Sequence, residues 1–515
     1  MASKLQNFLF IQVDQLAAQA LSVYGHPLVK APNIDSLAEK GVVFDNAYCN
    51  FPLCAPSRFS MLSGQLASRI GAFDNGAEFP AAIPTFLHYL RVMNYETCLS
   101  GKMHFIGPDQ LHGFEERLTT DFYPSNFSIT AEWGSPGPYS TANPSDPTPL
   151  GGMRAVLKAG VCKQTAQIDF DDEVTFHAVR KIYDIAREPA AQPFFLLVSF
   201  VHPHDPFVTT QEYWDRYDHD AIDLPAVPYI PADRSDPHSQ RIRSEFLIDQ
   251  AHLEEKHIRN ARHAYYGSIS YVDDQIGKLL RALRSTNLDR NTIVVFTSDH
   301  GEMLGERGLW FKRNFFEWSA RVPLVIHAPD RFAPRRVARA VSLVDLFPTI
   351  VELASAPGRM PDLVEEVDGH SLVGLLDGKE DGWPDTVFAE HTSECTLAPG
   401  FMIRRGHYKF ISCETDPAQL FDLAVDPKEL NNLSGRPEVA EVERELAAEV
   451  QRRWDSEALK REVVQSQRRR LFLNAALSMG TQTPWDFRPI VDASKQYYRG
   501  QCPYDEYFER QDLKD

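Results

Sequence analysis

The stretch "NTIVVFTSDHGEMLGE" (residues 291–306) tells most about how this chain folds. It opens with a short, continuous apolar run and then reaches an aspartate, a histidine and a glycine (299–301). An apolar run of this length, without polar alternation, predicts a strand that is buried on both faces. Two other stretches have the same plan: "NFLFIQVD" (7–14) ends in a carboxylate, and "PFFLLVSFVHPHDPF" (193–207) reaches two histidines and an aspartate.

Helical patterns lie between these strands. In "ARHAYYGSISYVDDQIGKLLRALRS" (261–285), for example, apolar residues recur every three or four positions. Alternating strands and helices predict the α/β class, with a large central, mostly parallel mixed sheet sandwiched by helices. Ligands bind such sheets outside the carboxyl ends of the strands. The polar residues that follow the three strands are therefore candidates for a functional site.

Length and composition predict two domains. The chain has 515 residues, and chains longer than about 250–300 residues usually divide into domains. The composition turns loop-like around "DGKEDGWPD" (377–385), so we expect a larger domain at 1–385 and a smaller C-terminal α+β domain at 386–515. A stretch rich in Pro, Gly and Ser, 125–160, is expected to be a long loop that acts as a lid or binding loop.

The smaller domain combines a strand pattern with a helical one. "FMIRRGHYKFISC" (401–413) predicts two antiparallel strands with Gly406 at the turn, and therefore an antiparallel sheet. The residues 439–477 have a mostly helical pattern. The last part, 483–513, is too aromatic to be a solvated tail, and we expect this extended segment to dock on another surface.

Charge and cysteine content exclude several classes. The net charge is −18, whereas nucleic-acid binders usually carry a basic face, so we expect no nucleic-acid partner. The seven cysteines are scattered without a CxxC pair, which argues against a disulfide framework or a structural zinc site. Because no apolar run is long enough to cross a bilayer or to serve as a leader, we expect a cytoplasmic protein without a membrane partner.

The polar residues at the strand ends form a pattern with chemical meaning. Carboxylates joined by one imidazole suit a hard or borderline divalent cation such as Ca²⁺, Mg²⁺ or Mn²⁺. A second set is cationic and comes from "LCAPSR" (53–58), "SGKMHF" (100–105) and "GLWFKRN" (308–314). A metal ion together with these cations would stabilise a multiply charged tetrahedral group, such as a sulfuryl or phosphoryl group.

At this point the motifs resemble a known family. "LCAPSR" followed by "SGQLASR" (63–69) is similar to the signature of the type I sulfatases, in the alkaline-phosphatase-like superfamily. Seven motifs in chain order resemble the choline-sulfatase branch, which hydrolyses choline-O-sulfate, and they cover almost the whole chain. They are LCAPSR, SGQLASR, FDNGAEF, GKMHFIGPDQLHGFEERLTTDFYP, SFVHPHDPF, SDHGEMLGERGLWFKRNFFEWSARVPL and YKFISCETDPAQLFDL.

The resemblance implies an alkaline-phosphatase-like fold and a nucleophile made from Cys54. In that family the motif cysteine is oxidised by a maturation system to formylglycine, and one oxygen of its hydrated gem-diol attacks sulfur. The resemblance also implies one divalent metal ion, calcium or manganese, with magnesium as a further candidate. The metal ligands would be Asp14, Asp299, His300 and the modified Cys54, while Gln15 would be a neutral ligand or only a hydrogen-bonding residue.

The remaining family roles map onto the cationic set. Arg58 would pair with the formylglycine oxygens and hold their loop. Lys102 and Lys312 would neutralise the sulfate oxygens, and His104 would take a proton from the second hydroxyl so that sulfate is expelled. The departing alkoxide needs an acid, which can contribute about 10²–10⁴-fold. We expect His202 in this role; His204 is the alternative.

The pocket for the alcohol follows from the resemblance to choline sulfatases. A trimethylammonium group requires aromatic faces and a carboxylate. Ile129 stands near the position where we expect an aromatic residue, so Trp133 and Tyr139 are the candidate substitutes. The polar and acidic substrate-binding candidates are Asn75, Glu390 and Asp505.

The sequence thus predicts a sulfuric ester hydrolase for a small alkyl sulfate, first of all choline-O-sulfate. Residues 1–385 would be its catalytic sulfatase domain, and the family's tails imply a homo-oligomer, a dimer or a tetramer. One alternative is a phosphonate monoester or phosphodiester hydrolase, or a promiscuous sulfatase, that uses the same machinery. A more distant alternative is a non-catalytic binder in which Cys54 stays unmodified.

Overall fold

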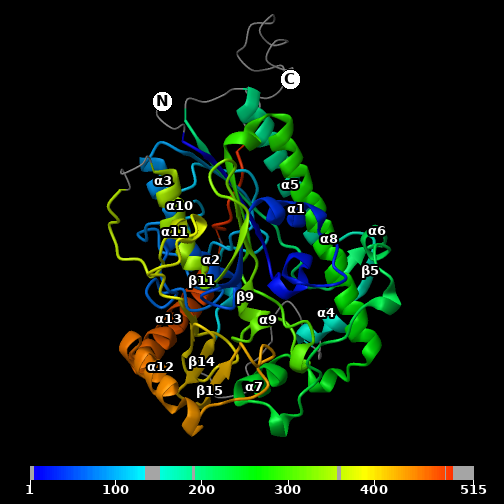
Figure 1. The fold of residues 1–515 in the computed structure, drawn as a ribbon, viewed down its shortest axis with the longest axis vertical. Coiled ribbons are helices and arrows are strands. Elements are labelled where there is room, and N and C mark those ends of the chain that lie inside the picture. Colours follow the sequence, from blue (N-terminus) through cyan, green and yellow to red (C-terminus); the bar gives the residue numbers. More distant parts are fainter. Residues whose placement is uncertain (1–4, 134–150, 188–191, 356–360, 482, 491–515) are drawn as a thin grey trace, which may run out of the picture.

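The computed structural model describes residues 5–133, 151–187, 192–355, 361–481 and 483–490. A nine-stranded mixed sheet forms the centre of the molecule, with helices on both faces (Figure 1). Its strands are β1 (Asn7–Val13), β2 (Val42–Tyr48), β3 (Glu96–Gly101), β4 (Glu116–Arg117), β6 (Phe194–Ser199), β8 (Thr292–Ser298), β9 (Arg321–Val322), β10 (Leu324–His327) and β11 (Arg335–Ser342).

The three apolar runs of the sequence are neighbouring strands in this sheet. The order is β11-β2-β10-β8-β1-β6-β3-β4, with β9 paired to β2. Strand β1 pairs in parallel with both β8 and β6, whereas β10 runs antiparallel to β2 and β8. The predicted mostly parallel mixed sheet is therefore confirmed. Val13 lies opposite Ser298 in the register, so Asp14 and Asp299 leave the same sheet edge side by side.

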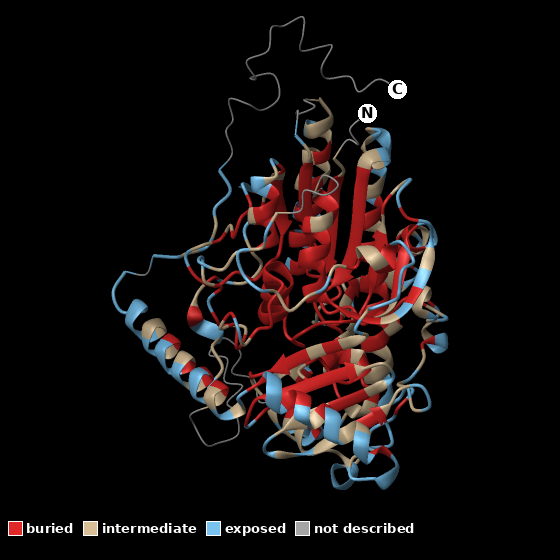
Figure 2. Cartoon of the chain, turned by 60° about the vertical axis from the view of Figure 1, so that its left-hand side comes forward, coloured by how far each residue is buried: buried red, intermediate tan, exposed pale blue. Residues whose placement is uncertain are grey.

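Alternation along the strands supplies two hydrophobic cores, one on each face. Phe8 and Phe10 of β1 belong to one core, whereas Leu9 and Ile11 belong to the other. Each of these side chains is fully buried, and such burial stabilises the fold by about 1.5–3 kcal/mol per side chain. Figure 2 shows the central strands as buried along their length, as expected for strands covered on both faces.

Helices cover the two faces of the sheet (Figure 1). Helices α2, α3, α10 and α11 lie on one side, and α1, α5 and α8 on the other. The helical pattern at 261–285 belongs to α8, which starts earlier than predicted, at Glu255. The helices that precede the C-terminal sheet are α1 (Pro32–Lys40), α2 (Cys54–Ser63), α3 (Phe86–Val92), α4 (Arg154–Leu157), α5 (Ala166–Arg187), α6 (Gln211–Trp214), α7 (Pro237–Glu245), α8 (Glu255–Ser285), α9 (Glu317–Ala320), α10 (Leu346–Ala354) and α11 (Val373–Leu376).

The C-terminal part contains a four-stranded antiparallel sheet. Its strands, in spatial order, are β12 (Thr386–His391), β13 (Gly400–Arg405), β14 (Tyr408–Cys413) and β15 (Asp416–Asp422). Gly406 stands at the β13–β14 turn with φ 57°, a left-handed conformation that glycine adopts without strain, as the sequence predicts. The sheet begins at Thr386; the division of the chain into domains at 385/386 stays a prediction.

Two helices follow this sheet. The helical prediction for 439–477 is confirmed as α12 (Ala440–Arg453) and α13 (Ser456–Leu477), interrupted after Arg453. Asp455 caps α13 by accepting a hydrogen bond from the Ala458 backbone N–H, which explains the restart at this point.

The loop prediction for 125–160 is partly wrong. The chain forms a short 3₁₀ helix at Phe127–Ile129, another at Gly151–Met153, and then α4. It also enters β5 (Gly160–Cys162), which pairs with β7 (Val208–Thr210). Residues 134–150, and with them Tyr139, lie outside the described residues. The remaining 3₁₀ turns are Ala18–Ala20, Ser22–Tyr24, His219–Ala221, Ala232–Arg234, Asp249–Ala251, Leu288–Asn291, Glu306–Gly308, Leu343–Asp345 and Pro437–Val439.

The start of the aromatic C-terminal segment contacts the same chain. The Asp486 carboxylate accepts hydrogen bonds from the backbone N–H and the hydroxyl of Ser125, at 2.9 and 3.0 Å. Trp485 packs on Phe127 with ring centroids 5.3 Å apart. Asp505 lies outside the described residues. Among the described helices, none is both long and apolar enough to cross a membrane.

Candidate active site

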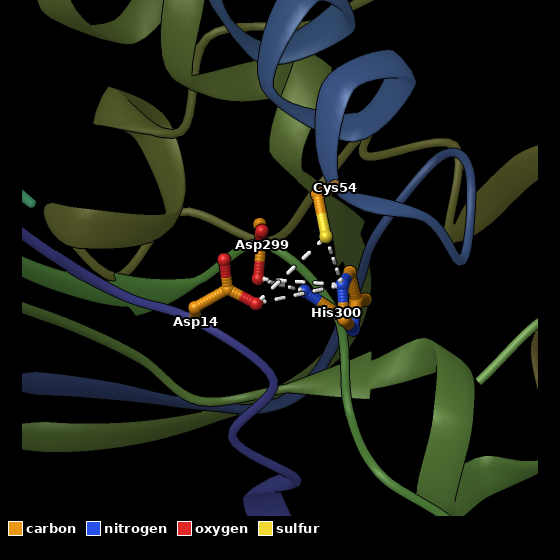
Figure 3. Close-up of side chains that lie close together, drawn as sticks. All are labelled: Asp14, Cys54, Asp299 and His300. Carbon is orange, nitrogen blue, oxygen red and sulfur yellow. Dashed lines mark hydrogen bonds and ion pairs between the residues drawn. The ribbon is translucent and has the colours of Figure 1, made fainter. Parts of the chain in front are cut away.

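Four potential metal ligands meet at the carboxyl edge of the central sheet (Figure 3). Asp14 follows β1, Asp299 and His300 follow β8, and Cys54 is the first residue of α2. One ligand atom from each of the four lies within 4.8 Å of the others, and all four residues are buried. The neighbouring strand ends explain the carboxylate pair, since parallel strands bring both residues to one edge.

Cys54 points into this cluster from the N-terminus of a fully buried helix. Its Sγ lies 3.2 Å from His300 Nε2 and 3.9 Å from Asp14 Oδ1. Burial alone would raise the pKa of the thiol, but the positive charges of Lys102 and Lys312, with His300, lower it well below its usual value. The structure therefore places the sequence-predicted nucleophile in a reactive environment.

His300 is oriented by its own backbone. Its Nδ1 lies 2.9 Å from the carbonyl oxygen of Gly301 and donates to it, which leaves the Nε2 lone pair facing the cluster. Gly301 must be a glycine, because a Cβ at this position would lie 2.0 Å from the Trp318 carbonyl oxygen. Two carboxylate oxygens, an imidazole nitrogen and a side chain at Cys54 form a donor set that fits a divalent cation.

Arg58 organises the carboxylates. It is fully buried, and its Nε and Nη2 lie 2.8 Å from Asp299 Oδ2 and 3.0 Å from Asp14 Oδ2. The other oxygen of each carboxylate is thereby left toward the cluster. These carboxylates, with Cys54, raise the pKa of Arg58 against the effect of burial. The ion-pair partners described for Arg58 are the two aspartates, and the expected pairing with the formylglycine oxygens stays a prediction.

Two lysines lie near the cluster. Lys102 forms an ion pair with Asp14 Oδ2, and its Nζ lies 4.4 Å from the ring centroid of Tyr123. Lys312 donates a hydrogen bond to Gln15 Oε1, and its Nζ lies 2.9 Å from His204 Nε2. Asp14 and Cys54 raise the pKa of Lys102 against burial, so it is a permanent cation. Both predicted lysines thus lie at the cluster.

Gln15 has hydrogen bonds to several neighbours. Its Nε2 donates to Glu302 Oε2 at 2.6 Å, and its backbone N–H donates to Asp299 Oδ1 at 3.1 Å. Its Nε2 also donates to Asp205 Oδ1 at 3.2 Å, and its Oε1 accepts from Lys312. Both ends of the side-chain amide are therefore hydrogen-bonded to other residues of the chain. Of the two expected roles, this geometry favours the hydrogen-bonding one.

Of the two histidines in the HPH motif, His204 lies at the cluster. Its Nε2 contacts the Nζ of Lys312. Burial and Lys312 would lower the pKa of His204, but the carboxylates of Asp205 and Asp14 and a hydrogen bond to Cys54 outweigh them and raise it. His202 has a different environment. Its Nδ1 lies 2.6 Å from Asp171 Oδ2, and its ring packs on another aromatic side chain. The sequence-based preference for His202 is therefore not supported by its placement.

His104 is the third histidine near Cys54. It is 3% exposed, and its ring stacks on Tyr123 with centroids 4.8 Å apart. It contributes to lowering the pKa of Cys54 through a hydrogen bond. Apart from this hydrogen bond to Cys54, no described residue engages its ring nitrogens. An imidazole whose contact is the Cys54 side chain suits a group that exchanges a proton during the reaction.

The predicted alcohol-binding residues are only partly brought together. Asn75 Oδ1 accepts from the backbone N–H of Ala55, at 3.0 Å, and so lies beside Cys54. Glu390 is fully buried, and its described partners are Ser68 and Trp454, away from the cluster.

Trp133 lies in a different position. Its indole N–H donates to the carbonyl oxygen of Ser393 at 2.8 Å. The residue after Ser393 is Glu394, a carboxylate that was not predicted from the sequence as a site residue. It forms an ion pair with Arg313. No local motif marks Glu394, because long-range packing of the β12–β13 connection brings it to the residue after Lys312.

Comparison with known proteins shows the family to which the chain belongs. The Sulfatase family model matches residues 6–356. The chain is a member of the sulfatase family. A second model, for the C terminus of choline sulfatase enzymes, matches residues 461–511 of this sulfatase.

Relatives extend the comparison over the whole chain. This sulfatase is 42% identical over 510 residues to the choline-sulfatase of Rhizobium meliloti, covering 97% of this chain and 96% of the relative. It is 29% identical over 456 residues to an arylsulfatase of Clostridium perfringens, covering 84% and 91% of the two chains. Its enzyme class, a sulfuric ester hydrolase, follows from the family and the full-length relative.

Solved structures confirm the fold. The phosphonate monoester hydrolase of Agrobacterium radiobacter superposes with a TM-score of 0.69 at 24% identity, over 89% of this chain and 96% of that one. A sulfatase from Bacteroides thetaiotaomicron gives a TM-score of 0.66 at 24% identity, over 87% and 92%. The predicted alkaline-phosphatase-like architecture is therefore confirmed.

Proposed function

We propose that this sulfatase hydrolyses a small alkyl sulfate ester, with choline-O-sulfate as the first candidate, through a formylglycine made from Cys54. The observation that carries this proposal is the position of Cys54 among Asp14, Asp299 and His300, with Lys102 and Lys312 close enough to lower its pKa. The full-length likeness to a choline-sulfatase supports the choice of substrate.

The family implies a divalent metal ion, which Asp14, Asp299, His300 and the modified Cys54 would hold. When bound, the ion supplies Lewis-acid polarisation and favours the ionised form of an oxygen nucleophile. Arg58 keeps the outer carboxylate oxygens occupied, so the inner ones stay aimed at the ion. The oxygen-rich donor set favours calcium or manganese, with magnesium as a third candidate.

The cationic side chains act on the sulfuryl group. Lys102 and Lys312 provide positive potential where negative charge accumulates on its oxygens. His204, held beside Lys312, protonates the departing alcohol oxygen, in place of the His202 expected from the sequence. His104 accepts a proton from the nucleophile's second hydroxyl so that sulfate can leave. Asn75 supports the nucleophile loop through Ala55.

Further properties belong to the same proposal. The protein acts in the cytoplasm, forms a dimer or tetramer, and depends on a maturation system that oxidises Cys54. Asp505, Glu390 and Trp133 stay substrate-binding candidates. Of these, Trp133 has the best support, because its indole lies against Ser393, beside the Glu394 carboxylate.

The test is a mass measurement of the peptide that contains Cys54, made together with a sulfate-release assay on choline-O-sulfate. A formylglycine mass with sulfate release supports the whole proposal, and Cys54→Ala should then abolish release. The aldehyde without release rejects choline-O-sulfate but keeps the chemistry. An unconverted thiol that still binds choline in protein from a host with the maturation system would favour the non-catalytic binder.

A phosphonate monoester or phosphodiester hydrolase with the same machinery is the second candidate. The observation that favours it is Gln15, a neutral residue that follows Asp14 at the strand end, together with the fold shared with phosphonate monoester hydrolases. Values of kcat/KM on matched aryl sulfate and aryl phosphonate esters separate the two functions. A larger value on the phosphonate ester favours the second candidate, and a larger value on the sulfate ester favours the first.

A further inference from the structure

Arg313 directly follows Lys312 and lies at the edge of the site. Its backbone N–H donates to the carbonyl oxygen of Pro52, two residues before Cys54, at 3.2 Å. Its φ is 79°, which turns the chain out of the regular extended path after Lys312. The side chain is 15% exposed, and the charge on Cys54 is close enough to help raise the pKa of Arg313.

On the proposed function, the alcohol part of the substrate extends toward this residue. An ester oxygen that departs under protonation by His204 lies near the His204–Lys312 contact, where the two nitrogens are 2.9 Å apart. The alcohol continues outward from that oxygen. Arg313 is the residue after Lys312, and Trp133 donates a hydrogen bond to Ser393, the residue before Arg313's partner Glu394.

Arg313 contacts the two features that a quaternary ammonium group would use. Its Nε and Nη2 lie 2.7 and 2.6 Å from Glu394 Oε1, and its guanidinium carbon lies 4.9 Å from the ring centroid of Phe246. The hydroxyl of Ser393 occupies the second oxygen of Glu394. Trimethylammonium groups bind through an aromatic face and a nearby negative charge. In this protein the guanidinium of Arg313 already contacts both the aromatic ring of Phe246 and the carboxylate of Glu394.

The charge balance of the pair supports this interpretation. Burial would raise the pKa of Glu394, but Arg313 outweighs it and lowers the value to about 2. Glu394 is therefore ionised and matched one to one by a guanidinium. A second carboxylate nearby, Glu245, has its pKa raised to about 7 by burial and by Glu394, so it adds only a partial charge at neutral pH.

We propose that Arg313 is a specificity-determining residue that competes with cationic alcohols for Glu394 and Phe246, and so weakens this sulfatase's preference for quaternary ammonium esters. The inference rests on the proposed function, since it concerns the alcohol end of the same site. A cationic alcohol must displace the guanidinium or bind beside it. A neutral alcohol of equal shape meets no such competition.

The probe pair is choline and 3,3-dimethylbutan-1-ol, in which a carbon atom replaces the nitrogen. Dissociation constants are measured by calorimetry on the full chain, purified from a host that converts Cys54. In the native protein the preference for choline should be within about threefold of unity. Arg313→Met should raise it by about tenfold, because cation–π and carboxylate contacts become available to the ligand.

Matched variants separate competition from loss of structure. Arg313→Lys keeps a cation and should keep the native ratio. Adding Glu394→Gln to Arg313→Met should remove the gain. The control is Arg241→Met: Arg241 holds the same segment through the Cys395 carbonyl oxygen, at 3.0 Å, and pairs with Asp416, so its loss should leave the ratio unchanged.

The outcomes for this inference and for the proposed function are distinct. An unchanged or lower choline preference in Arg313→Met, or an equal gain in Arg241→Met, overturns the role of Arg313, whatever the protein hydrolyses. Failure of the native protein to release sulfate from choline-O-sulfate rejects that substrate. A tenfold rise in the binding ratio would still establish the competition.

Discussion

His204 shows how the placement of a single side chain decides its role in the proposed mechanism. Positions 202 and 204 flank one proline and look equivalent as residue types, yet the first is held by Asp171 and the second lies against Lys312 and Cys54. A leaving-group acid must reach the departing oxygen, so geometry takes precedence over residue type. The assignment of His204 is the point at which the structure changes the proposed mechanism most.

The first prediction compares the two histidines. His204→Ala should lower kcat by about 10²–10⁴-fold on an alkyl sulfate, whose alkoxide needs a proton, and far less on p-nitrophenyl sulfate, whose leaving group does not. His202→Ala should lower both rates by a similar factor, because it removes the imidazole that contacts Asp171 and leaves only backbone N–H groups on that carboxylate. Steady-state kinetics on both esters checks this. Equal losses on the two esters in His204→Ala would contradict the acid role.

A second prediction at this scale concerns pH and Glu245. Burial and Glu394 raise its pKa from 4.5 to about 7, so the folded state binds the proton more tightly than the unfolded chain. The contribution of protonated Glu245 to the stability of the folded state is fully present below pH 4.5 and is lost as the pH rises through 7. Glu245→Gln should therefore be more stable than the native protein at pH 8, by about 1 kcal/mol after allowance for solvent screening, and equal at pH 4.5.

Thermal midpoints of Glu245→Gln and the native protein, measured every half unit from pH 4.5 to pH 8.5, check this. The two curves should separate as the pH rises. Parallel curves would show that Glu245 titrates normally. Glu254, the exposed N-cap residue of α8, provides a contrast through Glu254→Gln, because Lys256 lowers its pKa and any pH dependence should have the opposite sign.

At the scale of elements, a buried ion pair joins the C-terminal sheet to the segment that follows Lys312. Lys409 of β14 is fully buried, contacts Glu317 Oε1 of α9 at 2.5 Å and Glu429 Oε1 at 2.9 Å, and donates to the Phe315 carbonyl oxygen. Removing the cation leaves Glu429 without its buried ion pair, while Glu317 keeps only Arg321 as a described ion-pair partner, and an uncompensated buried charge is costly. The four-stranded sheet thus helps to hold the chain that carries Lys312.

The third prediction tests this connection. Lys409→Met should destabilise the protein by about 3–5 kcal/mol and lower the midpoint of urea unfolding. Lys379→Met is the matched control, because Lys379 forms an exposed pair with Asp377 at 3.4 Å and such pairs contribute about 0–1 kcal/mol. An equal effect of the two changes would contradict the proposed connection.

At the scale of the whole molecule, the metal site is close to electrically balanced without its ion. Arg58 and Lys102 neutralise Asp14 and Asp299. Chelation should therefore abolish sulfate release but leave the protein folded. The loss of stability should be about 2.7 kcal/mol when the ion had been present at a hundred times its Kd. Calorimetry before and after chelation, then with Ca²⁺, Mn²⁺ or Mg²⁺ restored, measures this and ranks the metals. Global unfolding on chelation would contradict the balance.

The sequence predicts the architecture better than the alcohol end of the site. The strands at Asn7, Phe194 and Thr292 follow from local apolar runs, and parallel pairing then brings Asp14 beside Asp299. By contrast, the choice between His202 and His204 depends on the path of a loop. The Arg313–Glu394 pair joins residues 81 positions apart, and no local pattern reports such a contact.

Helix α2 has a consequence for the order of events in the life of the protein. All ten of its residues, Cys54 to Ser63, are buried, and Cys54 itself is 2% exposed. If Cys54 is converted as proposed, the catalyst that oxidises it would have to reach a side chain that the folded protein covers. On the proposed function, conversion would then precede folding, and the fraction of active molecules would depend on which of the two events comes first during synthesis.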